Sequence, residues 1–269
     1  MTQSSKAGTA LVTGASSGIG AVYADRFAKR GYDLILVARD EVRLNALAEK
    51  LRAQHGVAAS VLPADLSTEV GIQAVEERLA AESAINLFVN NAGIARLGTL
   101  AEMRPQDISD IIQLNVNAAS RLAAAAARAF APRKAGRIIN IASVLALVSE
   151  HFNPVYNASK AFVLSLSQSM QNELAPLGVN VQAVLPGATR TEIWSRAGAD
   201  ISVLPPEMVM GVDEMVDAAL VGFDRGETVT IPALPDAAEF EAFTQARLKM
   251  GPNLSRDHAA ARYRTHTVT

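Results

Sequence analysis

The chain has 269 residues, of which 49% are hydrophobic and 19% are charged, and its formal net charge is -2. This composition is typical of a globular protein with a substantial core and excludes an intrinsically disordered chain. The basic residues form no block, so we expect no nucleic-acid partner. The absence of cysteine excludes disulfides, thiolate metal sites and a cysteine nucleophile.

A secreted or membrane-spanning protein is not expected either. Residues 1–8 lack the apolar segment of a signal peptide, and no run of about 18 apolar residues is present to span a bilayer. We therefore predict a soluble, cytoplasmic protein without a membrane partner. The four histidines, at positions 55, 151, 258 and 266, lack metal-ligand spacing, so no metal site is expected. His151 is interpreted as a loop residue, with a place in the lining of a substrate cleft as the alternative.

Short aliphatic and β-branched runs recur along the chain and are separated by longer stretches of helical spacing. The runs cover residues 10–12, 34–37, 60–62, 87–89, 137–141, 180–185 and 228–231. Residues 39–54 illustrate the helical spacing, since their apolar side chains recur every three or four positions. This alternation predicts an α/β fold, a doubly wound parallel sheet of the Rossmann type with about seven strands.

No linker rich in Gly, Pro or Ser divides the sequence, so residues 1–269 are predicted to form a single domain. Residues 188–211 show weaker periodicity and are predicted to be a helical lid that follows the sixth strand. The C-terminal part is helical in pattern as far as about Met250. Residues 251–269 then form a tail without a clear pattern.

The first strand leads directly into residues 13–20, with the sequence TGASSGIG, and a helix follows. Glycine permits a tight turn there, and the free N–H groups and dipole of a helix N-terminus favour an anion such as a pyrophosphate. No Gly-Lys-Ser/Thr follows, which excludes an ATP-binding P-loop. For the motif taken alone, a purely structural turn is the alternative. The cofactor-binding residues predicted in this turn are Gly14, Ser16, Ser17, Gly18, Ile19 and Gly20.

The end of the second strand predicts which nucleotide is bound. Ala38 stands where an acidic residue usually accepts hydrogen bonds from the adenosine ribose, and Arg39 follows it. An arginine fork pairs well with a phosphate dianion, which favours NADP(H) over NAD(H). Two alternatives stay open. Asp40 would serve NAD(H) if the strand ended one residue later, or Arg39 would be a solvated cap of the next helix.

Three side chains suggest acid-base chemistry at an oxygen. Ser143 follows the fifth strand, and Tyr156 and Lys160 are four residues apart in a helical pattern that opens at Tyr156 and reaches Leu174, so they share a helix face. An ammonium one turn away is expected to lower the phenol pKa, and Ser143 would hold the substrate oxygen near the tyrosine. Taken alone, the Tyr/Lys pair is also typical of a surface helix with a packed ring and a solvated amine.

These motifs together resemble the short-chain dehydrogenase/reductase family, in its compact single-domain branch, over residues 9–232. The resemblance implies that Asp65, with the neighbouring Leu66, contacts the adenine, and that residues 90–93 frame the adenine-ribose region. Further cofactor contacts are implied for Asn91, Ala92, Gly93, Pro186, Gly187, Thr189 and Thr191, of which the last four match the segment that cradles the nicotinamide carboxamide.

The family's catalytic tetrad corresponds to Asn115, Ser143, Tyr156 and Lys160. By resemblance, Asn115 bends its helix and holds a water of a proton relay, while Tyr156 and Lys160 also contact the cofactor and Lys160 binds the nicotinamide ribose. The sequence departs from the family in two places. Thr189 replaces a more usual aliphatic residue, and Ser17 stands where many NADP-using members carry Lys or Arg.

The sequence therefore predicts an NADP(H)-dependent oxidoreductase that transfers a hydride between the nicotinamide and a carbonyl or secondary alcohol, with Tyr156 as general acid/base. The apolar residues Val144, Leu145, Leu147, Ile193 and Trp194 flank the predicted pocket and indicate an apolar small-molecule substrate. The family resemblance implies a homodimer or homotetramer. A catalytically silent nucleotide-sensing protein on the same fold is the alternative. A sugar-nucleotide epimerase or dehydratase is disfavoured, because too few residues follow the last strand to build a substrate domain.

Overall fold

The structure, a computed structural model, describes residues 7–150 and 153–264. It divides into two compact units, Met1–Ala233 and Leu234–Thr269. The first unit holds the sheet and every predicted site residue, and the second holds one helix and the C-terminal segment. The single domain predicted for residues 1–269 stays a prediction.

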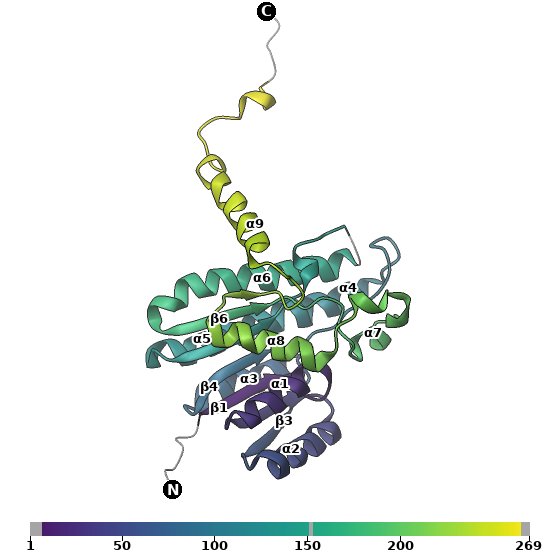
Figure 1. Ribbon diagram of the computed structural model, residues 1–269, viewed down its shortest axis with the longest axis vertical. Coiled ribbons are helices and arrows are strands. Elements are labelled where there is room, and N and C mark those ends of the chain that lie inside the picture. The colour runs from purple at the N-terminus through teal and green to yellow at the C-terminus, as the bar shows by residue number, and fades with distance from the viewer. Residues whose placement is uncertain (1–6, 151–152, 265–269) are drawn as a thin grey trace, which may run out of the picture. The chain divides into compact units, whose positions relative to one another are not determined.

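The first unit is built on a seven-stranded sheet with the order β3-β2-β1-β4-β5-β6-β7, in which every neighbouring pair is parallel (Figure 1). The strands are β1 (Thr9–Thr13), β2 (Asp33–Ala38), β3 (Ala59–Pro63), β4 (Ile85–Asn90), β5 (Gly136–Ile141), β6 (Val179–Val184) and β7 (Val229–Thr230). Each of the seven predicted strands is present. The order in which strands are added to the sheet reverses after β3, since β4 lies on the other side of β1, and this switch point places the ends of β1 and β4 side by side.

Helices cover both faces of the sheet, as the doubly wound prediction requires. They are α1 (Gly18–Lys29), α2 (Glu41–His55), α3 (Glu69–Ala81), α4 (Pro105–Ile112), α5 (Ala119–Phe130), α6 (Pro154–Leu174), α7 (Ile193–Arg196) and α8 (Val212–Arg225). One apolar cluster joins α1, α2 and α8 to the sheet, and a second joins α3, α5 and α6 to its other face. The prediction of a Rossmann-type α/β fold is confirmed.

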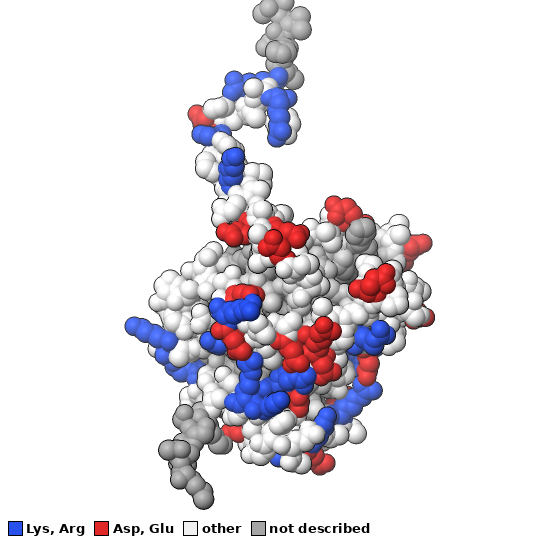
Figure 2. Space-filling view, viewed as in Figure 1, with Lys and Arg blue, Asp and Glu red and all other residues white. Residues whose placement is uncertain are grey.

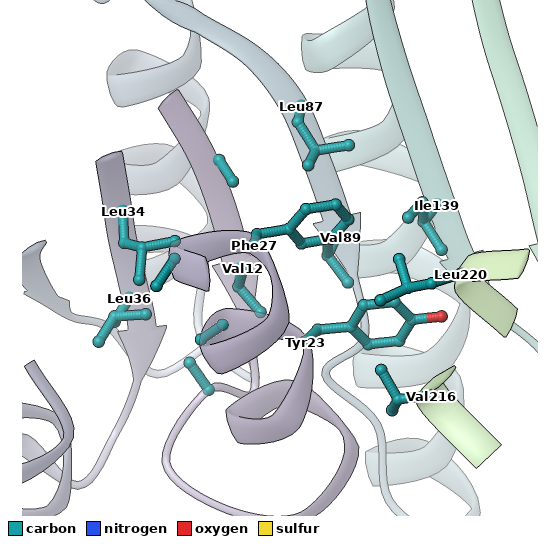
Figure 3. Packing of buried hydrophobic residues seen from close by; sticks show 14 of the residues in the cluster. Val12, Tyr23, Phe27, Leu34, Leu36, Leu87, Val89, Ile139, Val216 and Leu220 are labelled. Atoms are coloured by element: carbon teal, nitrogen blue, oxygen red, sulfur yellow. The ribbon is translucent and has the colours of Figure 1, made fainter. Parts of the chain in front are cut away.

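Aromatic side chains of α1 anchor that helix to the sheet. Tyr23 and Phe27 are fully buried, their ring centroids are 5.9 Å apart, and they pack among aliphatic side chains of the strands and of α8 (Figure 3). Burial of such rings contributes about 2 kcal/mol each. This packing holds the first turn of α1 beside the end of β1, where the glycine-rich sequence lies.

The segment predicted as a helical lid, residues 188–211, contains only short helical pieces. These are α7 and two 3₁₀ turns, Ile201–Val203 and Pro206–Met208. A bridge between Thr189 and Met210 pairs the two ends of the segment. The segment is therefore an excursion that leaves and re-enters the fold at one place, and its role as a lid stays a prediction.

The second unit contains α9 (Ala237–Met250), which has no buried residue. Its stability as a helix comes from local terms, because Asp236 caps it by accepting a hydrogen bond from the Ala238 N–H at 2.9 Å. Acidic side chains lie near its start and basic ones near its end, which suits the helix dipole (Figure 2). Past Met250 the described residues form two short 3₁₀ turns. Among the helices that the structure describes, none combines the length and the apolar character that crossing a membrane requires.

Candidate active site

The glycine-rich sequence forms the turn between β1 and α1. Gly14 has a φ of 65°, which favours glycine, and a Cβ at Gly20 would lie 2.4 Å from the carbonyl oxygen of Gly14. Helix α1 begins at Gly18, and Ser17 precedes it in an extended conformation without a capping hydrogen bond from its side chain. The N–H groups of this first turn are therefore left for another acceptor. Ser16 is half-buried in the turn, and Ile19 packs partly buried against the core.

The end of β4 is fastened to this turn by a set of hydrogen bonds. The Asn91 amide donates to the carbonyl oxygen of Thr13 at 2.8 Å, while the backbone N–H groups of Asn91 and Ala92 donate to the Thr13 hydroxyl at 2.9 and 3.1 Å. Thr13 itself is fully buried. The predicted residues Gly14, Asn91 and Ala92 thus come together at the switch point of the sheet.

The residues that would meet an adenosine group lie at the ends of β2 and β3. Strand β2 ends at Ala38, Arg39 is exposed, and the Asp40 side chain caps α2 by accepting from the Arg43 N–H at 3.0 Å. Partial burial raises the pKa of the Asp65 carboxyl, but hydrogen bonds from Ser67 and the charge of Arg39 together lower that pKa below its usual value. Arg39 and Asp65 therefore lie close enough to interact, whereas Leu66 is buried in the core.

Ser143, Tyr156 and Lys160 converge at the carboxyl end of β5. Ser143 caps the 3₁₀ turn Val144–Ala146 by accepting from the Leu145 N–H at 3.2 Å, and its hydroxyl is hydrogen-bonded to that of Tyr156. The ammonium of Lys160 donates to the carbonyl oxygen of Ile141 at 2.9 Å and lies 5.6 Å from the centre of the Tyr156 ring. All three side chains are buried. The prediction that Tyr156 and Lys160 share a helix face is confirmed.

The expected direction of the Tyr156 pKa shift is wrong. Burial raises the pKa of Tyr156 to about 12, and the hydrogen bond with Ser143 offsets only part of this rise. Burial also lowers the pKa of Lys160 to about 8. A lowered pKa would require the ammonium to act directly on the phenol oxygen, but in the structure the ammonium donates to the Ile141 carbonyl oxygen and lies beneath the ring. Loss of solvation therefore outweighs the attraction between ammonium and phenolate.

Asn115 lies in a π-helical turn, Gln113–Ala118, between α4 and α5, so the expected irregularity of its helix is present. Its amide exchanges hydrogen bonds with the backbone of Ile94, at 2.8 and 2.9 Å, and donates to the Ser159 hydroxyl at 3.2 Å. A Cβ at Gly93 would lie 3.2 Å from the Asn115 amide oxygen and 3.5 Å from the Lys160 nitrogen. Asn115 therefore joins the loop after β4 to the helix that carries Tyr156 and Lys160.

The segment after β6, residues 186–191, lies between the turn after β5 and the glycine-rich turn after β1. The carbonyl oxygen of Pro186 accepts from the Val144 N–H at 3.0 Å, and that of Gly187 accepts from the Thr189 hydroxyl at 3.1 Å. Thr191 faces the glycine-rich turn, because its Cγ2 is 3.3 Å from where a Cβ of Gly18 would stand. The predicted nicotinamide segment and the predicted pyrophosphate turn are thus neighbours.

Apolar side chains from three other segments meet around Tyr156. Ala95, Tyr156 and Ala197 form one buried cluster, and Leu145 and Ile193 pack against it. Val144 and Leu147 belong to a separate cluster nearby, and the Trp194 indole donates to the carbonyl oxygen of Thr189 at 2.9 Å. Trp194 therefore fastens the start of the 188–211 segment. His151 lies outside the described residues.

The residues present fit a dinucleotide. The turn after β1 supplies free N–H groups and glycines that let a phosphate approach. An exposed arginine, Arg39, follows the neighbouring strand β2 at the same edge of the sheet. In the part of the chain that the structure describes, no group of three or more His, Cys, Asp or Glu side chains is placed to hold a metal ion.

Sequence reasoning missed two features of the site. Asn153 caps α6, so the helix begins at Pro154 rather than at Tyr156, and the sequence Asn-Pro was the available signal. One terminal nitrogen of Arg43 donates to both carboxylate oxygens of Glu192, at 3.0 and 2.8 Å, and this ion pair joins α2 to the residue before α7. No sequence signal predicts a pair between residues so far apart in the chain.

Comparison with known proteins agrees with this arrangement. The family model for short chain dehydrogenases matches residues 8–202. The 3-oxoacyl-(acyl-carrier-protein) reductase FabG of Escherichia coli (strain K12) is 33% identical over 229 residues, which cover 82% of this chain and 92% of that protein.

Two solved structures are similar over almost the whole chain. A short-chain dehydrogenase from Sphingobium yanoikuyae, in complex with NADPH, is 52% identical with a TM-score of 0.93 and covers 96% of this chain and 100% of its own. The bulky-bulky ketone specific alcohol dehydrogenase from Comamonas testosteroni is 45% identical with a TM-score of 0.90 and covers 97% of this chain and 100% of its own. This chain belongs to the short-chain dehydrogenase family of oxidoreductases.

Proposed function

We propose that this protein is an NADP(H)-dependent oxidoreductase that interconverts a ketone or aldehyde and the corresponding alcohol, with Tyr156 as general acid/base. One observation carries the proposal. The hydroxyls of Ser143 and Tyr156 are hydrogen-bonded to each other, and Lys160 lies one turn further along the same helix. This group lies on the same edge of the sheet as a glycine-rich turn with free N–H groups.

The cofactor would lie along that edge of the sheet. The first turn of α1 would hold the pyrophosphate, Asp65 the adenine, and residues 186–191 the nicotinamide carboxamide. Lys160 would bind a ribose hydroxyl. Its ammonium lies beside Gly93, in the loop after β4, and has donors to spare after its bond to the Ile141 carbonyl oxygen. When bound, the nicotinamide supplies or accepts the hydride.

The proton is handled by the side chains of this chain. In reduction, the Ser143 hydroxyl donates a hydrogen bond to the carbonyl oxygen of the substrate, and the Tyr156 hydroxyl transfers its proton to that oxygen as the hydride reaches the carbon. The product is an alcohol and a phenolate. The Lys160 ammonium, 5.6 Å from the ring centre and bonded to the Ile141 carbonyl oxygen, adds a weaker attraction for that phenolate than a direct hydrogen bond would, and in the oxidation direction the phenolate takes the proton back. A pKa of about 12 keeps Tyr156 protonated at neutral pH, which suits the donor role.

NADP(H) is proposed over NAD(H) for two reasons. Both carboxylate oxygens of Asp40 already have partners, because one caps α2 and the other forms an ion pair with Arg43 at 3.4 Å. Asp40 is therefore a poor candidate to accept hydrogen bonds from the ribose of NAD(H). Arg39 is exposed beside Asp65 and is the arginine left for a 2′-phosphate. The similar Sphingobium yanoikuyae dehydrogenase was solved with NADPH.

An apolar substrate fits the surroundings of Tyr156. The side chains that meet there are Ala95, Leu145, Ile193 and Ala197, none of which carries a polar group. Leu97 and Leu100 continue the apolar character on the surface of the loop after β4, where they are 44% and 55% exposed. A ketone with bulky apolar substituents is therefore our preferred substrate class, and the Comamonas testosteroni relative is named for bulky-bulky ketones.

We also propose that the protein is a homodimer or homotetramer. Helix α9 buries none of its residues, although Phe243, Leu248 and Met250 are each about half exposed. A helix of 14 residues is marginal in water by itself. Contact with another copy of the chain would cover these side chains.

Turnover of a panel of carbonyl substrates, measured with NADPH and then with NADH, tests the proposal. We expect reduction of ketones with bulky apolar substituents, with kcat/KM for NADPH at least about tenfold above that for NADH, and an Arg39→Ser variant that loses this preference. Turnover with NADH alone would overturn the cofactor assignment. NADPH binding without turnover of any substrate would instead favour the nucleotide-sensing alternative.

A further inference from the structure

Asn153 makes four hydrogen bonds with a single buried amide. It is 1% exposed and lies at the N-terminus of α6, two positions before Val155 and three before Tyr156. Its amide oxygen accepts from the N–H groups of Val155 and Tyr156 at 3.0 and 3.1 Å. Because Pro154 has no N–H, these two bonds and the one from the Asn157 N–H to the Asn153 carbonyl, at 2.9 Å, satisfy the whole first turn.

The nitrogen of the same amide is used in another direction. It donates to the carbonyl oxygen of Gly98 at 2.9 Å and contacts the sulfur of Met103 at 3.0 Å. Both belong to the loop between β4 and α4. One side chain therefore connects the start of the catalytic helix to this loop, whose earlier part, at Ala95, packs against the Tyr156 ring.

We propose that Asn153 is a positioning residue, which fixes the backbone of Tyr156 through its amide oxygen and the substrate-facing loop 98–103 through its amide nitrogen. The inference rests on the proposed function. Tyr156 is the third residue of the helix, so its backbone position depends directly on the cap. The loop carries the exposed Leu100, which would meet an apolar substrate as it enters.

Two substitutions separate the two halves of this role. Asn153→Ser keeps an oxygen that can cap the helix but is too short to reach Gly98 and Met103, whereas Asn153→Ala removes both the cap and the tether. Gln182→Ala is the matched control. Gln182 is also a buried amide that joins two elements, donating to the Ala219 carbonyl at 3.0 Å and the Thr230 hydroxyl at 2.8 Å, but none of its partners belongs to the site.

The first readout is amide hydrogen exchange, which does not depend on activity. In the Asn153→Ser variant we expect faster exchange in residues 98–103 and unchanged exchange at the start of α6. In the Asn153→Ala variant both regions should exchange faster, while the Gln182→Ala variant should affect neither. Unchanged exchange in both Asn153 variants would overturn the inference.

The second readout is the division between KM and kcat for the best ketone of the panel, with NADPH saturating. We expect Asn153→Ser to raise KM about threefold to tenfold with little change in kcat, and Asn153→Ala to lower kcat about tenfold in addition. NADPH affinity should match that of the parent in both. A parent without turnover would overturn the proposed function and this inference together. An active parent whose Asn153 variants keep its KM and kcat would overturn the inference alone.

Discussion

At the scale of the residue, the site depends on burial of groups that prefer water. Lys160 and Tyr156 are both buried, and burial moves their pKa values in opposite directions, to about 8 and about 12. Each shift favours the neutral form of its side chain. The two residues therefore remain a phenol and, below about pH 8, an ammonium, which is the pair that reduction of a carbonyl needs.

The Lys160 shift predicts a pH dependence of stability. Below pH 8 the lysine is charged in both the folded and the unfolded chain, so the cost of burying the charge is fully present. Between about pH 8 and pH 10.5 only the unfolded chain holds the proton, so the free energy of unfolding rises with pH. A Lys160→Met variant lacks this rise. Its stability relative to the parent should therefore fall by about 2 kcal/mol between about pH 7 and pH 9.5, as measured by urea unfolding. A difference that does not change with pH would contradict the assigned shift.

Two hydroxyls are buried in the core, and we expect their removal to change the free energy of unfolding in different ways. The Tyr23 hydroxyl is buried among apolar side chains and has no hydrogen-bond partner among the described residues, and Figure 3 shows it beside Leu220. The Thr13 hydroxyl is also buried, but it donates to Val89 and accepts from two N–H groups. Tyr23→Phe should leave the free energy of unfolding unchanged or raise it by up to about 1 kcal/mol, whereas Thr13→Val should lower it by about 1–3 kcal/mol. Thermal or urea unfolding measures both, and a strongly destabilised Tyr23→Phe would show that its hydroxyl has a partner.

At the scale of the element, the strands were predictable and the starts of helices were less so. Parallel strands covered on both faces must be apolar throughout, and the runs at 34–37 and 137–141 differ from β2 and β5 by at most one residue at either end. Helix α6 begins at Pro154, two residues before the predicted start, because the cap is a single asparagine rather than a change in periodicity. The sequence Asn153-Pro154, a capping residue followed by proline, is the local signal for this helix start.

Other features of the site depend on tertiary contacts and have no local signal. The π-helical turn at Asn115 is held by hydrogen bonds to Ile94 and Ser159, which lie far from it in sequence. The direction of the Tyr156 pKa shift depends on how completely the ring is buried, which spacing in a sequence does not show. Motif spacing predicted which residues meet, and the structure was needed for how they interact.

At the scale of the whole molecule, the proposed assembly concerns α9, which has no buried residue. If copies of the chain cover it, replacing its apolar side chains should weaken assembly without unfolding the first unit. We expect the parent to have two or four times the 28.4 kDa chain mass in light scattering after size exclusion. A Phe243→Ser/Leu248→Ser variant should dissociate at higher concentrations than the parent. Val42→Ser is the matched control, because Val42 is 80% exposed on α2. A monomeric parent, or an unaffected double variant, would contradict the assembly role of α9.

In the proposed mechanism Tyr156 moves the proton, and most of the cofactor contacts come from other residues. The most direct test is the Tyr156→Phe variant, in which NADPH affinity and ketone turnover are measured on the same preparation. We expect NADPH to bind with an affinity within about twofold of the parent and kcat to fall about 10²- to 10⁴-fold, the usual contribution of a general acid. Turnover at the parent rate would contradict the account, because the proton would then have another source.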